Sequence, residues 1–155
     1  MADSRTGKPR AHARRKARRA LVQATYQWQM NDVGTSALRE EYHAGKALAK
    51  ADGDFFDDVL GRVTGQSKGL DAAFSGLLDR DLNALDQVEL AIMRLGTCEL
   101  LNRPDVPYRV VIDEYVELAK VFGAEQSYRY VNGVLDKVAK QVRGSERRAG
   151  AGKTG

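Results

Sequence analysis

The sequence predicts an all-α fold of about seven helices, and three observations support this class. Apolar residues recur with a spacing near 3.6 residues along most of the chain, and no useful stretch alternates with a period of two. Of the 155 residues, 43% are hydrophobic and 30% are charged, which leaves enough apolar material for a core. Gly and Pro fall mainly between the periodic segments, where they separate one helix from the next.

The first half of the chain is expected to hold four helices after a flexible basic arm over residues 1–12. In the first helix the apolar residues lie four, three and four positions apart, which places them on one side. Asn31, Asp32 and Gly34 then break the pattern. The four helices are expected over residues 13–30, 36–50, 54–63 and 69–79.

The second half is expected to hold three more helices. Asp86 and Glu89 are spaced as a capping box, in which each side chain accepts from the backbone N–H of the other. Pro104 and Pro107 end the helix that follows, because neither can continue a helix interior. Gly133 lies inside the last periodic segment, and close packing against another helix is the expected reason. The three helices are expected over residues 86–101, 108–122 and 125–142.

These elements predict one helical domain over residues 13–143, with subdomains of about 13–82 and 83–143. Residues 144–155 are rich in glycine and basic residues and are expected to be disordered. The last six residues match the G-x-G-x-x-G pattern of phosphate-binding loops. That pattern needs a preceding strand and a following helix, and neither is expected here.

Charge is distributed unevenly along the chain. Residues 1–19 carry eight basic residues and one acidic residue, and residues 137–155 carry six and one. Residues 20–136 carry 11 basic and 19 acidic residues, so basic ends flank an acidic middle. A basic arm of this kind suggests a polyanionic partner, most simply a nucleic acid.

Several function classes are excluded by composition. A single cysteine, Cys98, cannot form an internal disulfide, and with only His12 and His43 a structural zinc site is not expected. No set of residues supports catalysis, and no cofactor is expected. The chain has no apolar run that could cross a membrane and no secretory signal. A transit peptide is disfavoured because the Arg-rich start continues into a core helix, so we expect a cytoplasmic protein.

The basic run at the start of the first helix carries the strongest functional signal. Arg15, Arg19 and Tyr26 share one helix face, so cations and an aromatic ring lie together. Dense positive charge near the positive end of a helix dipole costs stability unless an anion compensates it. Nucleic-acid phosphate is the natural anion, and an exposed ring suits a single strand. The alternative is a solvated basic arm that only aids solubility. The run consists of Arg14, Arg15, Lys16, Arg18 and Arg19.

The chain resembles the NusB family of bacterial transcription antitermination factors. The basic run is followed by QATYQW over residues 23–28, and DQVE stands at residues 86–89. The most specific blocks come later, and most of residues 13–140 is covered. They are PDVPYRVVI at 104–112, ELAK at 117–120, FGAE at 122–125 and YVNGVLDK at 130–137.

The resemblance implies two packed helical subdomains and a non-enzymatic role. Family members bind the single-stranded boxA element of nascent ribosomal RNA leaders, and they bind it better with NusE, a small-subunit ribosomal protein. The complex joins other Nus factors on RNA polymerase. Carried over, the RNA-binding residues would be Arg14, Arg15, Lys16, Arg18, Arg19, Tyr26, Phe122, Gln126, Arg129 and Tyr130. The NusE-binding residues would be Tyr26, Glu89 and Arg94.

Two departures from the family pattern stand out. The position of Gln126 is commonly acidic in the family, and here it is neutral. The usual His-Lys-Phe is here Tyr128-Arg129-Tyr130, which keeps a cation and an aromatic ring. Phe122 ends an apolar stripe, so a core position is the alternative to an RNA contact.

Other readings stay open on the sequence alone. NusB-like domains also help some RNA methyltransferases to bind ribosomal RNA, so an accessory ribosomal-RNA-binding domain is one alternative. A helical protein-interaction scaffold with only generic polyanion binding is another. Some family members self-associate, so a homodimer is also possible.

Overall fold

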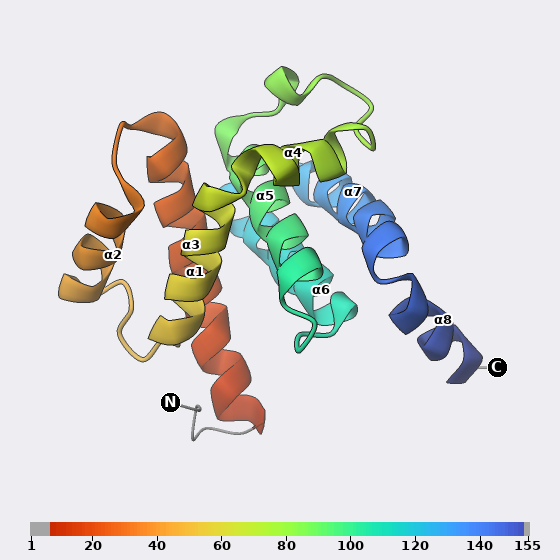
Figure 1. The fold of residues 1–155 in the computed structure, drawn as a ribbon, viewed down its shortest axis with the longest axis horizontal. Helices are drawn as coiled ribbons and strands as arrows, with labels where there is room; N and C mark the ends of the chain where they lie inside the picture. The colour runs from red at the N-terminus through yellow and green to blue at the C-terminus, as the bar shows by residue number, and fades with distance from the viewer. Residues whose placement is uncertain (1–6, 154–155) are drawn as a thin grey trace. The chain divides into compact units, whose positions relative to one another are not determined.

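The computed structural model describes residues 7–153, and these form α-helices and one short 3-10 helix, with no strand among them (Figure 1). The predicted all-α class is confirmed. The chain divides into two compact units, Met1–Gly65 and Gln66–Gly155. We expected a division near residue 82. The observed one comes earlier, because the helix that follows Gln66 packs against later helices of the second unit.

The first unit consists of α1 (Gly7–Met30), α2 (Thr35–Ala44) and α3 (Gly53–Gly65). The expectation of a flexible arm is wrong for residues 7–12, which form the first turns of α1. Pro9 permits this start, because proline is tolerated in the first turn of a helix, where N–H groups lack intrahelical acceptors. Residues 1–6 lie outside the described part of the chain.

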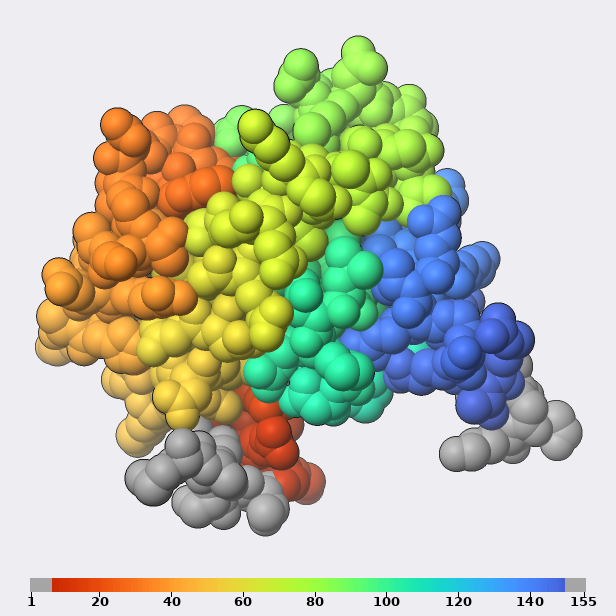
Figure 2. Space-filling model, viewed as in Figure 1, coloured from red at the N-terminus to blue at the C-terminus, as the bar shows by residue number. Residues whose placement is uncertain are grey.

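Packing of α1, α2 and α3 against one another forms the core of the first unit. The α2 helix ends at Ala44, earlier than expected, and Gly45 follows it in an extended conformation. Figure 2 shows α2 and α3 as neighbouring parts of one surface. The largest fully buried side chains of this unit are Leu21, Leu38, Phe55, Phe56 and Leu60.

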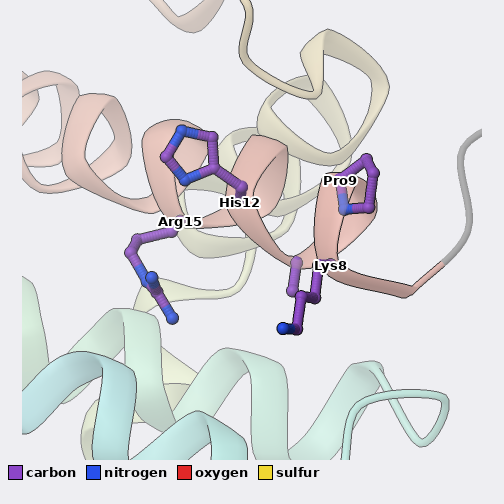
Figure 3. Close-up of a pocket in the computed structure, with 5 residues that line it drawn as sticks. Lys8, Pro9, His12 and Arg15 are labelled. Carbon is purple, nitrogen blue, oxygen red and sulfur yellow. The ribbon is translucent and has the colours of Figure 1, made fainter.

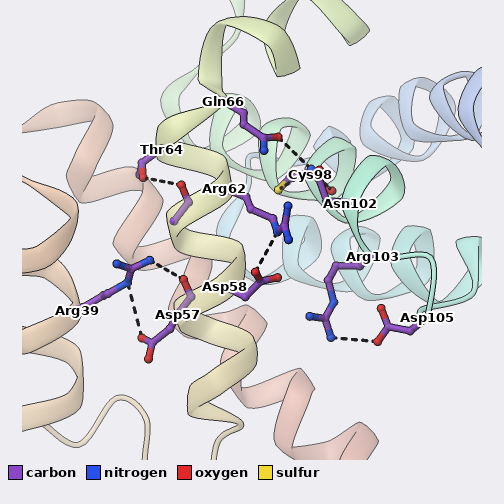
Figure 4. Close-up of polar contacts among 11 residues, drawn as sticks. Arg39, Asp57, Asp58, Arg62, Thr64, Gln66, Cys98, Asn102, Arg103 and Asp105 are labelled. Carbon is purple, nitrogen blue, oxygen red and sulfur yellow. Dashed lines mark hydrogen bonds and ion pairs between the residues drawn. The ribbon is translucent and has the colours of Figure 1, made fainter.

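Polar contacts fasten α2 to α3 at the edge of this core (Figure 4). Arg39 donates from Nη2 to the carbonyl oxygen of Asp57 at 2.8 Å, and the hydroxyl of Thr35 donates to that of Thr64 at 2.8 Å. Arg62 and Asp58 pair along α3, with 2.9 Å between Nε and Oδ1. These arginines therefore already have acceptors within the unit.

The second unit consists of α4 (Ser67–Ser75), the 3-10 helix η1 (Leu82–Ala84), α5 (Gln87–Asn102), α6 (Tyr108–Phe122), α7 (Ser127–Val142) and α8 (Gly144–Lys153). The α4 helix ends four residues before the expected residue 79, and a loop with η1 leads to α5. The predicted capping box is confirmed, since Asp86 and Glu89 accept from each other's backbone N–H.

The α5 helix lies at the centre of the second unit and packs against α4, α6 and α7. Nearly all of its residues from Ala91 to Leu100 are buried, including Cys98 as predicted. Gly96 allows the close approach of α7, because a Cβ built there would lie 2.7 Å from Cδ1 of Leu135. The close packing of α5 against α7 therefore requires the small residue Gly96 in α5.

Arg143 joins the end of α7 to the end of α5. Its side chain is 8% exposed and donates to the carbonyl oxygens of Leu100 and Val106 at 2.8 and 3.0 Å. It also donates to the carbonyls of Glu99 and Arg103 and to the carboxylate of Glu146. The last carbonyls of a helix have no intrahelical donor, and this guanidinium supplies donors for those at the end of α5.

The expected disordered tail is wrong for residues 144–153, which form α8. Glu146 accepts from the backbone N–H of Tyr108 at 2.9 Å, and Arg147 donates to Asp136 at 2.7 Å. The guanidinium of Arg147 lies 5.1 Å from the ring centroid of Tyr108. Polar and charged side chains thus hold the first turn of α8 against α6 and α7. The segment lacks the apolar spacing by which the other helices were predicted. Residues 154–155, the end of the expected disordered tail, lie outside the described part of the chain.

Gly133 does not have the predicted packing role. It is exposed, and a Cβ at this position would meet no atom within 4 Å.

We therefore expect Gly133→Ala to raise the free energy of unfolding by about 0.5–1 kcal/mol, the propensity difference between the two residues in a helix. Gly96→Ala should lower it by about 1–3 kcal/mol, because the new methyl overpacks Leu135. Urea unfolding followed by circular dichroism measures both, and equal effects would contradict this assignment.

We expect Arg143→Leu to destabilise the second unit by about 3 kcal/mol, because the carbonyls of Leu100 and Val106 lose this donor and Glu146 loses its ion-pair partner. Arg143→Lys is the matched control, since it keeps the charge but cannot donate in so many directions. It should recover only part of the loss. Urea unfolding and hydrogen exchange at the end of α5 report the effect. A loss below about 1 kcal/mol would show that the carbonyls find other partners.

Candidate nucleic-acid interface

One outer stripe of α1 changes from cationic to apolar along its length. Lys8, His12, Arg15 and Arg19 are exposed and lie four, three and four residues apart, so they share one helix face. Further along the same side of α1, beyond the buried Val22, lie Tyr26 and Met30, which are 39% and 52% exposed. The predicted grouping of Arg15, Arg19 and Tyr26 on one exposed face is confirmed.

A hollow of about 460 Å³ lies along the first turns of this stripe. Figure 3 shows Lys8 and Arg15 projecting to the same side of α1. Lys8 and Arg15, two helical turns apart, give this hollow its positive charge. It is lined by Lys8, Pro9, Ala11, His12 and Arg15.

The five cations of the basic run do not share one environment. Arg15 and Arg19 are exposed and Lys16 is half-buried. Arg14 and Arg18 turn inward, and each guanidinium lies 4.9 Å from the ring centroid of Phe55 on α3. The expectation of a phosphate contact is wrong for Arg18, because only 2% of it is exposed. Four residues separate it from Arg14, so both side chains lie over α3.

Asp52 explains why Arg14 turns inward. Its carboxylate accepts from the backbone N–H of Phe55 at 3.0 Å and lies 3.5 Å from Nε of Arg14. Its own backbone N–H donates to the carbonyl of Ala13 at 3.0 Å. Asp52 is only 6% exposed, and a buried carboxylate requires partners of this kind. The basic side chain thus compensates a buried acid within the first unit.

The start of α7 brings together several residues of the predicted site. Gln126 is exposed and has a left-handed backbone with φ of 71°. Ser127 is buried and donates from Oγ to Oε2 of Glu89 at 2.6 Å. Arg129 is exposed beside Tyr128, to whose hydroxyl it donates at 3.2 Å. Gln126 and Arg129 are therefore available to a ligand at the surface of the second unit.

Tyr130 is half-buried, and Arg80 from the α4–α5 loop covers its ring. The guanidinium lies 4.2 Å from the ring centroid, and Nε of Arg80 donates to Asp79 at 2.8 Å. The pKa of the Tyr130 hydroxyl is raised, first by burial and then by the neighbouring Asp79. That hydroxyl is buried without a well-formed hydrogen bond. A predicted ring-stacking residue is thus partly covered by an arginine that the sequence analysis did not select.

Two further predicted residues, Glu89 and Arg94, serve the fold, and a third, Phe122, is half-buried. Glu89 is 9% exposed and holds Ser127 in addition to its capping box. Arg94 forms a paired contact with the Asp71 carboxylate of α4, with both nitrogen–oxygen distances at 2.8 Å. Phe122 is half-buried at the end of α6. The contacts of Glu89 and Arg94 give both an internal role, so Tyr26 is the predicted partner-binding residue with the most accessible side chain.

A groove of about 540 Å³ between α6 and α7 lies on the second unit. Lys120 and Arg129 flank the Tyr128 ring in it, at 5.1 and 5.8 Å from its centroid. Asp113 and Glu117 also line the groove, so its walls carry both acidic and basic groups. This mixed lining gives the groove no single charge preference.

Among residues 7–153, no group of three or more His, Cys, Asp or Glu side chains could hold a metal ion. Within the same residues, no helix is long and apolar enough to cross a membrane.

Sequence reasoning missed four residues of this region. Lys8 and His12 were assigned to a flexible arm, although their spacing from Arg15 already continues the helix face. Asp79 and Arg80 lie in a loop without periodicity. No sequence pattern predicts that Arg80 contacts a tyrosine fifty residues later.

Comparison with known proteins identifies the family of this chain. The NusB family model matches residues 15–140. "Transcription antitermination protein NusB" of Alcanivorax borkumensis is 55% identical over 134 residues, covering 86% of this chain and 89% of that protein. The protein of the same name from Marinomonas sp. is 48% identical over 139 residues, covering 88% and 80%. The solved structure of T. maritima NusB has a TM-score of 0.74 at 31% identity and covers 87% of this chain and 96% of that one. The chain described here therefore belongs to the NusB family.

Proposed function

We propose that this chain is a transcription antitermination factor that binds boxA-type single-stranded RNA of nascent ribosomal RNA leaders. It acts together with NusE in a complex that includes other Nus factors and RNA polymerase, and it does so in the cytoplasm. Family membership and the names of its relatives support this proposal. The observation that carries it is the outer stripe of α1, with its exposed cations and its exposed aromatic ring.

The charge of this stripe favours a polyanion. The first turn of α1 contains no acidic residue, although the positive end of a helix dipole favours negative charge there. Lys8, Arg15 and Arg19 add further positive charge on one face. RNA phosphate groups would neutralise this positive charge, and binding would release counterions from the RNA. The cationic part of the stripe is therefore proposed to bind the RNA backbone.

The other end of the stripe suits bases and a protein partner. Tyr26 offers a ring on which an unpaired base can stack, a contact that contributes about 1–3 kcal/mol per base in other single-strand binders. Met30, one turn further on, adds an exposed apolar side chain of the kind found in protein interfaces. We propose that NusE contacts this apolar end, with Tyr26 at the border between RNA and protein.

The first experiment measures fluorescence anisotropy of a boxA-like single-stranded RNA and a scrambled RNA at several salt concentrations, with and without NusE. We expect a preference for boxA that increases with NusE. A scaffold would bind neither RNA. Equal, salt-sensitive binding to both RNAs without an effect of NusE would indicate only generic polyanion binding and would contradict the proposal.

The double variant Arg15→Ala, Arg19→Ala tests the stripe itself. Each phosphate contact contributes roughly 0.7 to the slope of log affinity against log salt for single strands, so the slope should become shallower by about 1.4. Lys46→Ala is the matched control, because Lys46 is an exposed cation of the same unit outside α1. An unchanged slope in the double variant would exclude these two arginines as phosphate ligands.

We expect Gln126→Asp to weaken RNA binding severalfold. The substitution adds a negative charge at the exposed start of α7, in the same helix as Arg129, another residue expected to contact RNA. Misfolding would not explain a loss, because Asp tolerates left-handed backbone and favours a helix N-terminus. Gln126→Asn is the neutral control and should bind RNA like the parent protein. Unchanged or tighter binding by Gln126→Asp would place the RNA elsewhere.

A further inference from the structure

The loop between α4 and α5 carries a pair of side chains to which no role has been assigned. In Figure 1 this loop arches over α4 before it enters α5. Arg80 and Asp79 are neighbours in the loop, joined by the 2.8 Å bond from Nε to Oδ1. The Arg80 side chain is 43% exposed although it lies on the Tyr130 ring. Its guanidinium therefore contacts the tyrosine ring while part of the side chain stays accessible to solvent.

This arrangement changes what a ligand meets at Tyr130. A nucleobase cannot stack on the covered face of the ring while the guanidinium occupies it. The outer face of the guanidinium is planar and weakly hydrated, and such a group stacks well on aromatic rings. At this point of the surface, the flat group that a base can reach belongs to Arg80.

Asp79 orients the Arg80 guanidinium by accepting a hydrogen bond from it, and its carboxylate partly neutralises the guanidinium charge. The pKa of Asp79 lies below its usual range, first because Arg80 donates to its carboxylate and second because the Tyr130 hydroxyl is adjacent. The carboxylate is therefore ionised at neutral pH and pairs with the guanidinium. Pairing leaves less charge for a phosphate but does not obstruct stacking. The pair is thus better suited to a base than to the RNA backbone.

We propose that Arg80 is a base-stacking residue for single-stranded RNA, supported from below by the Tyr130 ring and held by Asp79. This inference rests on the proposed RNA-binding function and extends its site to the α4–α5 loop. Gln126 and Arg129, exposed at the start of the helix that carries Tyr130, are then available for the sugar-phosphate groups on either side of the stacked base.

The test compares RNA affinity and its salt dependence for the full chain and for Arg80→Ala. Loss of one stacked base is expected to weaken binding roughly tenfold, with the salt slope unchanged. Arg80→Lys keeps the charge without the plane and should also bind more weakly than the parent. Arg109→Ala is the matched control, since Arg109 is an exposed arginine of the same unit that lies 5.4 Å from the Tyr108 ring. It should bind RNA like the parent.

A fluorescent base gives an independent readout. With 2-aminopurine placed at successive positions of the RNA, one position should show a change on binding that disappears in Arg80→Ala. Asp79→Asn tests the positioning role, because a freed guanidinium should reach a phosphate and steepen the salt slope by up to about 0.7. An unchanged slope would remove Asp79 from the proposal.

The outcomes separate the two proposals. If the parent protein fails to bind RNA, the proposed function fails and this inference fails with it. If the parent binds and Arg80→Ala binds equally well, only the inference is overturned. A weaker Arg80→Ala whose salt slope is shallower by about 0.7 would identify Arg80 as a phosphate ligand and overturn its stacking role. Circular dichroism confirms that each variant keeps its helices.

Discussion

The buried guanidinium of Arg143 is the interaction on which the second unit depends most. Removal of a charged group from water is costly, and only a full set of acceptors compensates for it. The end of α5 provides such a set in its last carbonyls, and Glu146 completes it. The same contacts fix where α7 ends and where α8 begins. The end of α5, the buried guanidinium of Arg143 and the start of α8 are therefore held together by the same set of contacts.

The same constraint sorts the arginines of this chain into two groups. Arg18 and Arg143 are buried and stabilise their own units, whereas Arg15 and Arg19 remain at the surface. The total of 25 basic residues therefore overstates the charge that a nucleic acid can meet. The available charge is reduced near the C-terminus as well, because Arg143 and Arg147 donate to acceptors within the second unit.

The spacing of apolar residues predicted most helices well, but it did not predict which arginine side chains turn inward. Apolar spacing reports which side of a helix faces the core, and it located α5, α6 and the Asp86 capping box. A long arginine has apolar methylenes and a planar head, so it can lie in either environment. Arg15 and Arg18 look equivalent in sequence. They differ because Asp52 and Phe55, which attract the inner arginines, come from a different helix and its preceding turn.

The layered contact of Arg80 on Tyr130 shows how a non-local neighbour changes the chemistry of a site residue. A bare tyrosine ring offers a base a negative face, whereas the arginine-covered ring offers a flat cation whose charge Asp79 balances. Stacking depends on contact area and dispersion, so it survives this neutralisation, while phosphate attraction does not. The two parts of the proposed interface therefore differ in kind. The α1 stripe contributes salt-sensitive attraction to the backbone, and the α4–α5 loop contributes a salt-insensitive contact to a base.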